Sequence, residues 1–147
     1  MARHPITTAA IADWCDAIGD ANPCYVDEEY AARGVHGGLV APPATLDMWD
    51  RAGLPGQAPG ARGGDDPRSE AIRLLDAHGY VGVVAVTSEL VLERYLRPGE
   101  LVSNVQVLEE ITGEKRTALG VGHFVTTRHR YVTADGEHVG DLLFRIL

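Results

Sequence analysis

Side chains that could carry acid–base chemistry gather in one short stretch near the start of the chain, Asp20-Ala-Asn-Pro-Cys-Tyr25. A carboxylate such as that of Asp20 can orient a water molecule for a nearby general base. A phenol, the group that Tyr25 carries, is in general a poor base at neutral pH, whereas an imidazole, the group that His36 carries, is well suited to that role. Asp20, Asn22, Tyr25 and His36 are therefore the residues whose placement decides the chemistry.

Each of these residues also has a purely structural explanation. Asp side chains often cap tight turns, and we favour that role for Asp20 at the Asn22-Pro23 turn. For Tyr25 we expect a packed ring with a hydrogen-bonded hydroxyl rather than catalysis. His36 is the substitute base, but its loop, Gly34-Val-His-Gly-Gly38, gives it a freedom that a positioned base should not have. The sequence thus yields a degenerate motif with no confident catalytic residue.

Two helices are expected around this stretch. Thr7 or Thr8 can cap a helix that runs through Ile18, where apolar residues at i, i+3, i+4 and i+7 form one face. Gly19 is suited to end that helix. A second, short helical turn is expected from Asp27 to Arg33. Both elements lie next to the candidate residues along the chain.

A third helix is predicted over residues 41–53, with proline in its first turn and glycine at its end. Its apolar surface is wide, which favours a central helix clasped by a sheet. Residues 54–66 are rich in glycine and proline and read as a flexible surface loop. Asp66-Pro67 then opens a fourth helix, with Ile72 and Leu75 inward and Gly79 closing it.

Extended patterns dominate the rest of the chain. Residues 81–86 form a nearly continuous apolar run, as expected for a strand buried on both faces, and the strand continues with alternation through Leu90, Leu92 and Arg94. Ala134-Asp-Gly136 is a hairpin signal. Further strands are expected over residues 101–111, 117–132 and 139–147. Helices followed by an antiparallel meander predict an α+β domain of two layers.

Composition narrows the class of protein. The chain has 147 residues and a formal net charge of −8, which favours one acidic globular domain over a nucleic-acid binder. It contains no apolar run long enough to span a membrane and no apolar segment after its first residues, so we expect a cytoplasmic protein. Cys15 and Cys24 have no CxxC partner, and no histidine pair has metal-ligand spacing. We expect no metal and no disulfide.

Several motifs together carry a family resemblance: Ala17-Ile-Gly-Asp20-Ala-Asn-Pro23, Tyr25-Val-Asp-Glu-Glu-Tyr-Ala31, Val40-Ala-Pro-Pro43, Tyr80-Val-Gly-Val-Val-Ala85, Arg94-Tyr-Leu-Arg-Pro-Gly-Glu100 and Thr117-Ala-Leu-Gly120. They resemble the MaoC-like dehydratases, in the version found in the N-terminal half of FAS1-type enzymes. Within that family the last three of these motifs look most like the hydratase domain of the larger subunit of a heteromeric enoyl-CoA hydratase that degrades steroid side chains. The likeness covers most of residues 8–147.

The resemblance implies a hot-dog fold, an antiparallel sheet wrapped around a central helix, and a 2-enoyl-CoA hydratase activity. Its motif places a catalytic Asp where Asp20 stands and a catalytic His where this chain has Tyr25. The central helix normally presents N–H groups to the thioester oxygen, and Pro42 and Pro43 have none. Pro42, Pro43 and Trp49 are the candidates for contacting a substrate, although a central helix also needs Trp49 for its core.

A division of labour follows from this resemblance. We expect a small MaoC-like partner subunit to supply Asp and His, while this chain shapes the pocket for a bulky, steroid-derived CoA thioester without any cofactor. Scattered arginines could hold a CoA phosphate. One alternative is a homodimeric hydratase using its own Asp20 and His36 or Tyr25, and another is a non-catalytic acyl-CoA-binding module. Because the chain stops inside its last predicted strand, we also expect the natural protein to continue beyond Leu147.

Overall fold

The computed structural model describes residues 4–50 and 66–147, which group into two compact units. One unit comprises Met1–Arg51, Leu92–Asn104 and Tyr131–Gly140, and the other comprises Ala52–Val91, Val105–Arg130 and Asp141–Leu147. The helices are α1 (Thr8–Ile18), α2 (Pro23–Val26), α3 (Glu28–Arg33), the 3-10 helix η1 (Pro43–Met48) and α4 (Pro67–Ala77). The strands are β1 (Ala85–Leu92), β2 (Val102–Ile111), β3 (Lys115–Thr117), β4 (Gly120–Gly122), β5 (Val125–Thr133) and β6 (His138–Ile146).

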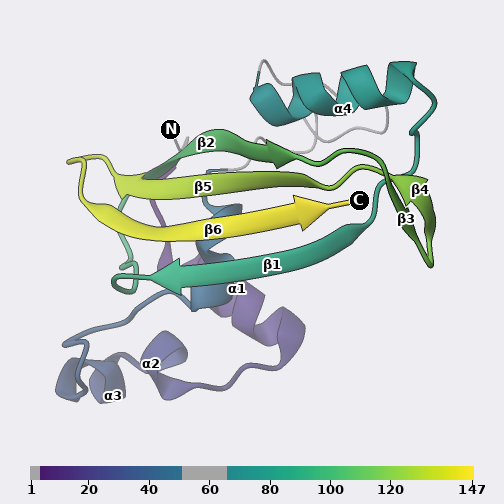
Figure 1. The fold of residues 1–147 in the computed structure, drawn as a ribbon. Helices are drawn as coiled ribbons and strands as arrows, with labels where there is room; N and C mark the ends of the chain where they lie inside the picture. The colour runs from purple at the N-terminus through teal and green to yellow at the C-terminus, as the bar shows by residue number, and fades with distance from the viewer. Residues whose placement is uncertain (1–3, 51–65) are drawn as a thin grey trace. The chain divides into compact units, whose positions relative to one another are not determined.

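Four strands form one antiparallel sheet in the order β1-β6-β5-β2 (Figure 1). Backbone hydrogen bonds at the two ends of β1 and β6 join residue 84 to 147 and residue 93 to 139. Residue numbers therefore rise along β1 as they fall along β6, so the two strands are antiparallel. β2 and β5 are antiparallel by the same pattern, since backbone hydrogen bonds join residue 101 to 134 and residue 112 to 124. The predicted hairpin between β5 and β6 is confirmed, because Thr133 N–H donates to Glu137 at 2.9 Å and Gly136 has φ 85°.

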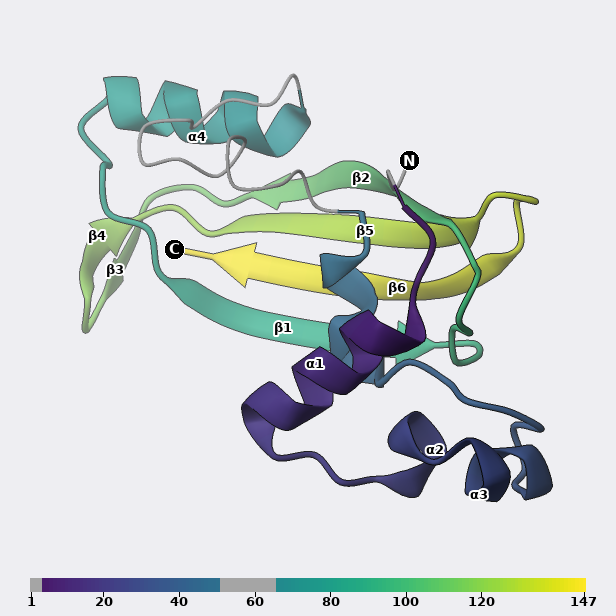
Figure 2. The same cartoon turned by 180° about the vertical axis from the view of Figure 1, so that it is seen from behind.

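The first unit begins with the helices that precede and follow the candidate motif (Figure 2). As predicted, α1 is capped by the Thr7 hydroxyl, which accepts from Ala10 N–H at 3.1 Å, and it ends at Gly19 with φ 71°. Cys15 is buried on its inner face, but Ile18 is 58% exposed, so the predicted apolar face is shorter than its spacing suggested. The second predicted helical turn is confirmed as α3, and Asp27 is its N-cap.

The third predicted helix, over residues 41–53, is wrong in type. Residues 43–48 form a 3-10 helix instead of an α-helix, and residues 51–65, with the predicted loop, lie outside the described residues. The reason lies at the helix start, where Pro43 has no N–H to donate. Thr45 donates its N–H to the Pro42 carbonyl at 2.9 Å and its hydroxyl to the same oxygen at 2.6 Å, which tightens the turn.

Two carboxylates fasten η1 and the residues after it to strands of the same unit. The Tyr131 hydroxyl on β5 donates to Asp47 at 3.0 Å, and the Tyr131 side chain is 0% exposed. Asn104 on β2 donates its backbone N–H to Asp50 at 2.9 Å. Asp47 in η1 and Asp50 just after it are therefore each hydrogen-bonded to a strand.

In the second unit, α4 opens at Asp66 as predicted, with Ser69 N–H donating to the Asp66 carboxylate at 2.9 Å. Gly79, with φ 93°, follows its end. Only Ala71 of this helix is buried, whereas the predicted inward residues Ile72 and Leu75 are half-buried. Among the described residues, no helix is both long and apolar enough to cross a membrane.

Two strand predictions are right in type but wrong in their bounds. Residues 81–84 are not a strand and β1 begins only at Ala85, while Val81, Val83, Val84 and Val86 are all exposed. The predicted long strand over 117–132 is three strands, because Gly120 adopts φ 126° and the chain folds back between Thr117 and Gly120 as a two-stranded hairpin. The apolar run predicted burial, and the chain by itself leaves these valines exposed.

The bond between Tyr131 and Asp47 gives a stability prediction. Replacing Tyr131 with Phe leaves the Asp47 carboxylate without this donor, and we expect a loss of about 1 kcal/mol in the free energy of unfolding. Urea denaturation followed by circular dichroism measures it. Tyr30→Phe is the matched control, since Tyr30 is 49% exposed, and we expect no change there. Equal effects of the two substitutions would contradict a structural role for the Tyr131 hydroxyl.

Candidate functional site

The polar side chains of the degenerate motif are engaged in building the turn after α1. The Asp20 carboxylate accepts from Asn22 N–H at 3.0 Å, and the Asn22 side-chain oxygen accepts from Cys24 N–H at 3.0 Å. Asn22 is thereby the N-cap of α2, which has proline as its first residue. Both side chains act on the backbone of their own segment, as the structural explanation of Asp20 requires.

Tyr25, at the position of the family's histidine, lies half-buried on α2. Burial raises the pKa of its phenol above the ordinary value of 10, and the neighbouring Tyr95 and Asp20 raise it further. A group whose pKa is raised in this way holds its proton at neutral pH. The Tyr25 hydroxyl can therefore donate a hydrogen bond, but it cannot serve as the base that activates water.

His36 is better fixed than its glycine neighbours suggested. Its imidazole packs against the ring of Tyr95, with 4.6 Å between centroids and 49° between the planes. The guanidinium of Arg97 donates to the His36 carbonyl oxygen. Tyr95 thus neighbours both Tyr25 and His36. Sequence reasoning missed it because residues 94–100 served only as one of the motifs that carry the family resemblance.

A hydrogen bond between Asp20 and His36 would be the sign of an acid–base pair within this chain. In the described part of the chain, the Asp20 carboxylate is bonded to Asn22 N–H, and the contacts of His36 are with Tyr95 and Arg97. The structure brings the two residues into the same unit without joining them. Catalysis by His36 stays an untested prediction.

The start of η1 offers little room or polarity to a substrate. Pro42 is buried, Pro43 has no N–H, and Thr45 N–H is already bonded to the Pro42 carbonyl. The cavity beside these prolines measures about 10 Å³, the space of a single water molecule at most. Trp49 donates its indole N–H to the Thr45 hydroxyl at 3.0 Å. Substrate contact by Pro42, Pro43 or Trp49 stays a prediction.

The described residues do not support a cysteine nucleophile or a metal site. Both cysteines are free thiols, and Cys15 is buried in α1. Burial raises the pKa of the Cys15 thiol, and the carboxylates of Asp20 and Asp16 raise it further, so the thiolate nucleophile is disfavoured. Within residues 4–50 and 66–147, no group of three His, Cys, Asp or Glu side chains is placed to hold a metal ion.

An antiparallel sheet with short helices and the turn described above defines an α+β hot-dog protein, and comparison with known proteins supports this class. Residues 2–142 match the family described as "FAS1-like, dehydratase domain region". The chain belongs to this FAS1-like dehydratase family.

Three relatives place the chain more closely. It is 43% identical over its whole length to the 3-oxo-4,17-pregnadiene-20-carboxyl-CoA hydratase alpha subunit of Mycobacterium tuberculosis, covering 46% of that protein. It is 37% identical to a probable enoyl-CoA hydratase alpha subunit of Thermomonospora curvata, with 99% of this chain and 45% of that protein covered. A chain in the crystal structure of the ChsH1-ChsH2 complex from M. tuberculosis matches with TM-score 0.89 and 43% identity, covering 99% of this chain and 79% of that one. The present chain spans about half the length of the curated relatives it matches.

The turn at Asp20 leads to a prediction that separates structure from chemistry. An Asn side chain can accept the same hydrogen bond from Asn22 N–H, so Asp20→Asn should keep the stability of the chain, whereas Asp20→Ala should lose about 1 kcal/mol. Thermal unfolding of the three proteins measures the difference. Equal losses for both substitutions would mean that the carboxylate charge, and not the turn, is what the position requires.

The raised pKa of Tyr25 gives a second prediction. When the ultraviolet absorbance of phenolate is followed as the pH rises, the component that disappears in Tyr25→Phe should titrate above the ordinary value of 10. The sign follows from burial, because the neutral phenol is favoured in the folded state. Tyr30→Phe serves as the exposed control. A Tyr25 component that titrates near pH 7 would restore Tyr25 as a candidate base.

Proposed function

We propose that this chain is the non-catalytic hot-dog half of a heteromeric 2-enoyl-CoA hydratase that acts on a bulky, steroid-derived CoA thioester. The observation that carries the proposal is Tyr25, a half-buried phenol with a raised pKa at the position where the family's motif has histidine. The engagement of Asp20 in its own turn supports the same reading. A small MaoC-like partner subunit then supplies the catalytic Asp and His.

The reaction itself shows what is missing from the chain. In hydration of a trans-2-enoyl thioester, the oxygen of water bonds to Cβ, one proton of that water passes to a base, and a proton is delivered to Cα. Donors to the thioester oxygen stabilise the charge that develops there. Tyr25 holds its proton at neutral pH, and Pro43 opens η1 without a donor. Every proton transfer is therefore assigned to the partner.

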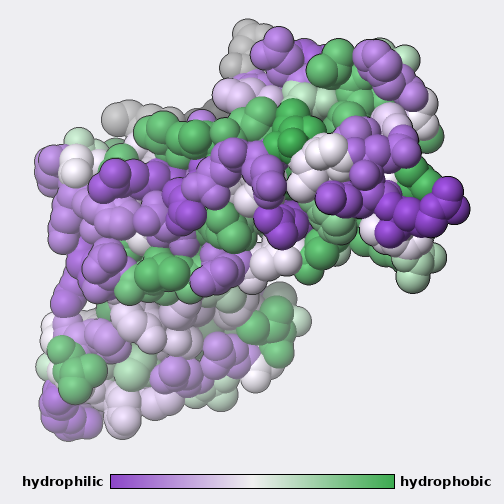
Figure 3. Space-filling view, viewed as in Figure 1, coloured by the Kyte–Doolittle hydropathy of each residue, from purple (hydrophilic) through white to green (hydrophobic). Residues whose placement is uncertain are grey.

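The surface of the second unit supports a partner subunit. Eleven of the sixteen large hydrophobic residues that are exposed among the described residues belong to this unit, and they include Val105 and Val107 on β2. Figure 3 shows hydrophobic side chains along β2. β1 and β2 are the edge strands of the sheet, and uncovered apolar edge strands favour association. The complex in which a 43% identical chain was crystallised agrees with such an arrangement.

The substrate class follows from the relatives by analogy. The M. tuberculosis relative is named as a hydratase of a steroid-derived CoA thioester, and the T. curvata relative as a probable enoyl-CoA hydratase. Identity of 43% over the full length of this chain supports transferring the enoyl-CoA chemistry and, more specifically, the steroid acyl group. We propose that the chain contributes shape to the acyl pocket and needs no cofactor.

Coexpression with the small MaoC-like subunit tests the division of labour. Hydration of a steroid enoyl-CoA should appear only with the partner and should vanish when the partner's own Asp and His are replaced. Tyr25→Phe and Asp20→Asn in this chain should leave kcat within a few-fold, because a true acid–base residue would cost about 100-fold or more.

The alternatives appear as distinct outcomes of this assay. Full turnover by this chain alone, lost in His36→Ala, would overturn the proposal in favour of a homodimeric hydratase. Binding of the thioester by the complex without any turnover would overturn it in favour of a binding module. Both outcomes are read from the same preparations, with the uncatalysed reaction as the baseline.

The exposed valines of β2 give a prediction for assembly. Val107 is 51% exposed in the chain, and a partner that covers it would bury the charge in Val107→Lys, so the heteromer should dissociate at least about tenfold more readily. Val35→Lys is the matched control at a valine that is 97% exposed in the other unit. Analytical ultracentrifugation of the copurified subunits measures both. Equal assembly of the two variants would exclude β2 from the interface.

A further inference from the structure

The first unit contains an arginine, Arg94, whose hydrogen bonds go beyond a single ion pair. Arg94 follows β1, and its guanidinium donates two N–H groups, at 2.9 and 2.6 Å, to the two carboxylate oxygens of Glu137 in the β5–β6 hairpin. Two more N–H groups donate to Glu100, at 2.7 and 3.1 Å, and one donates to the Tyr95 carbonyl oxygen at 3.0 Å. A guanidinium has five N–H donors, so each donor of Arg94 has an acceptor.

Stability alone does not explain so complete a set of bonds. The side chains of Arg94 and Glu137 are 29% and 59% exposed, and ion pairs this close to water contribute little to folding. Bidentate pairing of a guanidinium with a carboxylate does fix geometry, because two parallel bonds hold both planes. The bonds of Arg94 therefore fix the position of the turn that follows it.

The turn over residues 94–100 holds both ends of the segment that contains the degenerate motif. Ile6, next to the N-cap of α1, exchanges two backbone hydrogen bonds with this turn, at 2.9 and 2.8 Å. At the other end of the segment, Ala41 N–H donates to the Leu96 carbonyl oxygen at 2.8 Å. Residues 7–40 therefore begin and end on the same turn.

Side chains of the same turn contact the loop at His36 and the start of η1. The ring of Tyr95 packs against the ring of His36, and Arg97 donates to the His36 carbonyl oxygen. Tyr95 also lines, with Pro42 and Pro43, the cavity of about 10 Å³. Because packing there leaves so little space, the two prolines cannot shift unless the turn moves with them.

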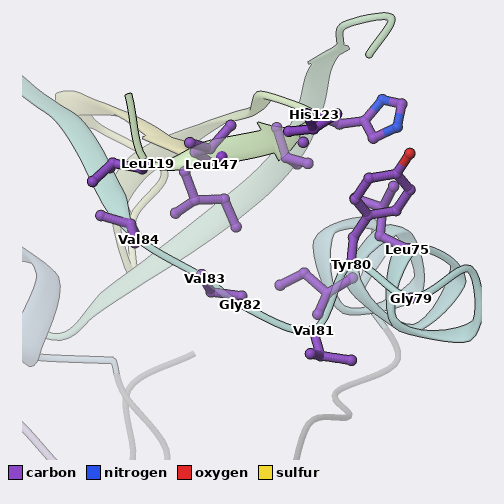
Figure 4. Close-up of a pocket in the computed structure, with 16 residues that line it drawn as sticks. Leu75, Gly79, Tyr80, Val81, Gly82, Val83, Val84, Leu119, His123 and Leu147 are labelled. Atoms are coloured by element: carbon purple, nitrogen blue, oxygen red, sulfur yellow. The ribbon is translucent and has the colours of Figure 1, made fainter. Parts of the chain in front are cut away.

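The cavity in Figure 4 is lined by other residues. Every residue that lines this cavity of about 230 Å³, such as Leu75 and Leu119, belongs to the second unit. Arg94, Tyr95 and Pro42 belong to the first unit. The turn therefore positions the His36 loop and the start of η1 rather than a wall of that cavity.

We propose that Arg94 is a positioning residue of the assembled hydratase. With Glu100 and Glu137 it fixes the turn that holds the start of η1, and through η1 it sets how tightly the complex binds its thioester. The inference rests on the proposed function, in which this chain shapes the binding surface and the partner transfers the protons. Loss of a contact of that kind weakens substrate and transition state equally, so it raises KM and leaves kcat unchanged.

The first experiment measures position and needs no turnover. The ring of Tyr95 shifts the NMR signals of the His36 ring, and Tyr95→Leu gives their unshifted reference. Arg94→Lys keeps the positive charge but has three donors on one atom instead of five in a fork, so we expect the His36 signals to move toward that reference. Arg33→Lys is the matched control, because Arg33 pairs with Glu29 in the same unit and is 71% exposed. We expect wild-type His36 signals there.

The second experiment measures the reaction of the complex assembled with the partner subunit. Arg94→Lys should raise KM for a steroid enoyl-CoA about tenfold and keep kcat within about threefold of the wild type. Arg33→Lys should change neither constant. Glu137→Gln removes one of the two carboxylate charges at an exposed side chain and should raise KM by a smaller factor. It replaces Arg94→Lys if that variant fails to fold, which circular dichroism checks.

Unmoved His36 signals in Arg94→Lys would overturn the inference. An unchanged KM, once corrected for the assembled fraction, would also overturn it and would leave Arg94 with a role in stability only. If the complex does not turn over, the Kd of the thioester from calorimetry takes the place of KM. An inactive complex in which Arg94→Lys weakens binding would refute only the proposed function, and an active complex with equal KM values only the inference. A complex that neither binds nor hydrates the thioester would refute both.

Discussion

The constraint on which the rest depends is whether a side chain in the turn after α1 can accept a proton from water. The turn after α1 keeps the outline of a hydratase motif, yet its carboxylate is bonded to the backbone two residues on, and its second position holds a phenol whose burial favours the protonated form. Replacing imidazole by phenol at this point removes the base without disturbing the turn, because Asp20 and Asn22 still cap it. The segment forms its turn, and its phenol cannot serve as the base that activates water.

The second theme is apolar surface that the chain does not cover by itself. In the second unit, Val81, Val83 and Val84 stay exposed before β1, and Val105 and Val107 stay exposed on β2. Leaving this much apolar area in water is unfavourable unless another surface removes it. A protonated phenol at Tyr25 and exposed apolar residues on edge strands are the two observations that support the proposal of one half of an assembly.

Local signals predicted much of the fold. Thr7 and Gly19 delimit α1, Asp66 opens α4, and Gly136 turns the last hairpin, since each acts through neighbours a few residues away. Other properties were harder to predict. The 3-10 form of η1 depends on Thr45 bonding back to Pro42, which the helix pattern did not indicate, and residues 81–84 are exposed although their apolar run predicted burial. For the site, the motif residues were visible in the sequence, whereas Tyr95 became visible only when folding brought it to Tyr25 and His36.

The most direct measurement of whether this chain moves a proton is the pH dependence of kcat/KM for the complex assembled with a catalytic partner. Profiles are compared for complexes that contain the wild-type chain and Tyr25→Phe. If the phenol takes no part in proton transfer, the two profiles have the same limbs and the same apparent pKa values. Loss or displacement of a limb in the Tyr25→Phe complex would show that Tyr25 carries a catalytic proton, and the account would be wrong at its centre.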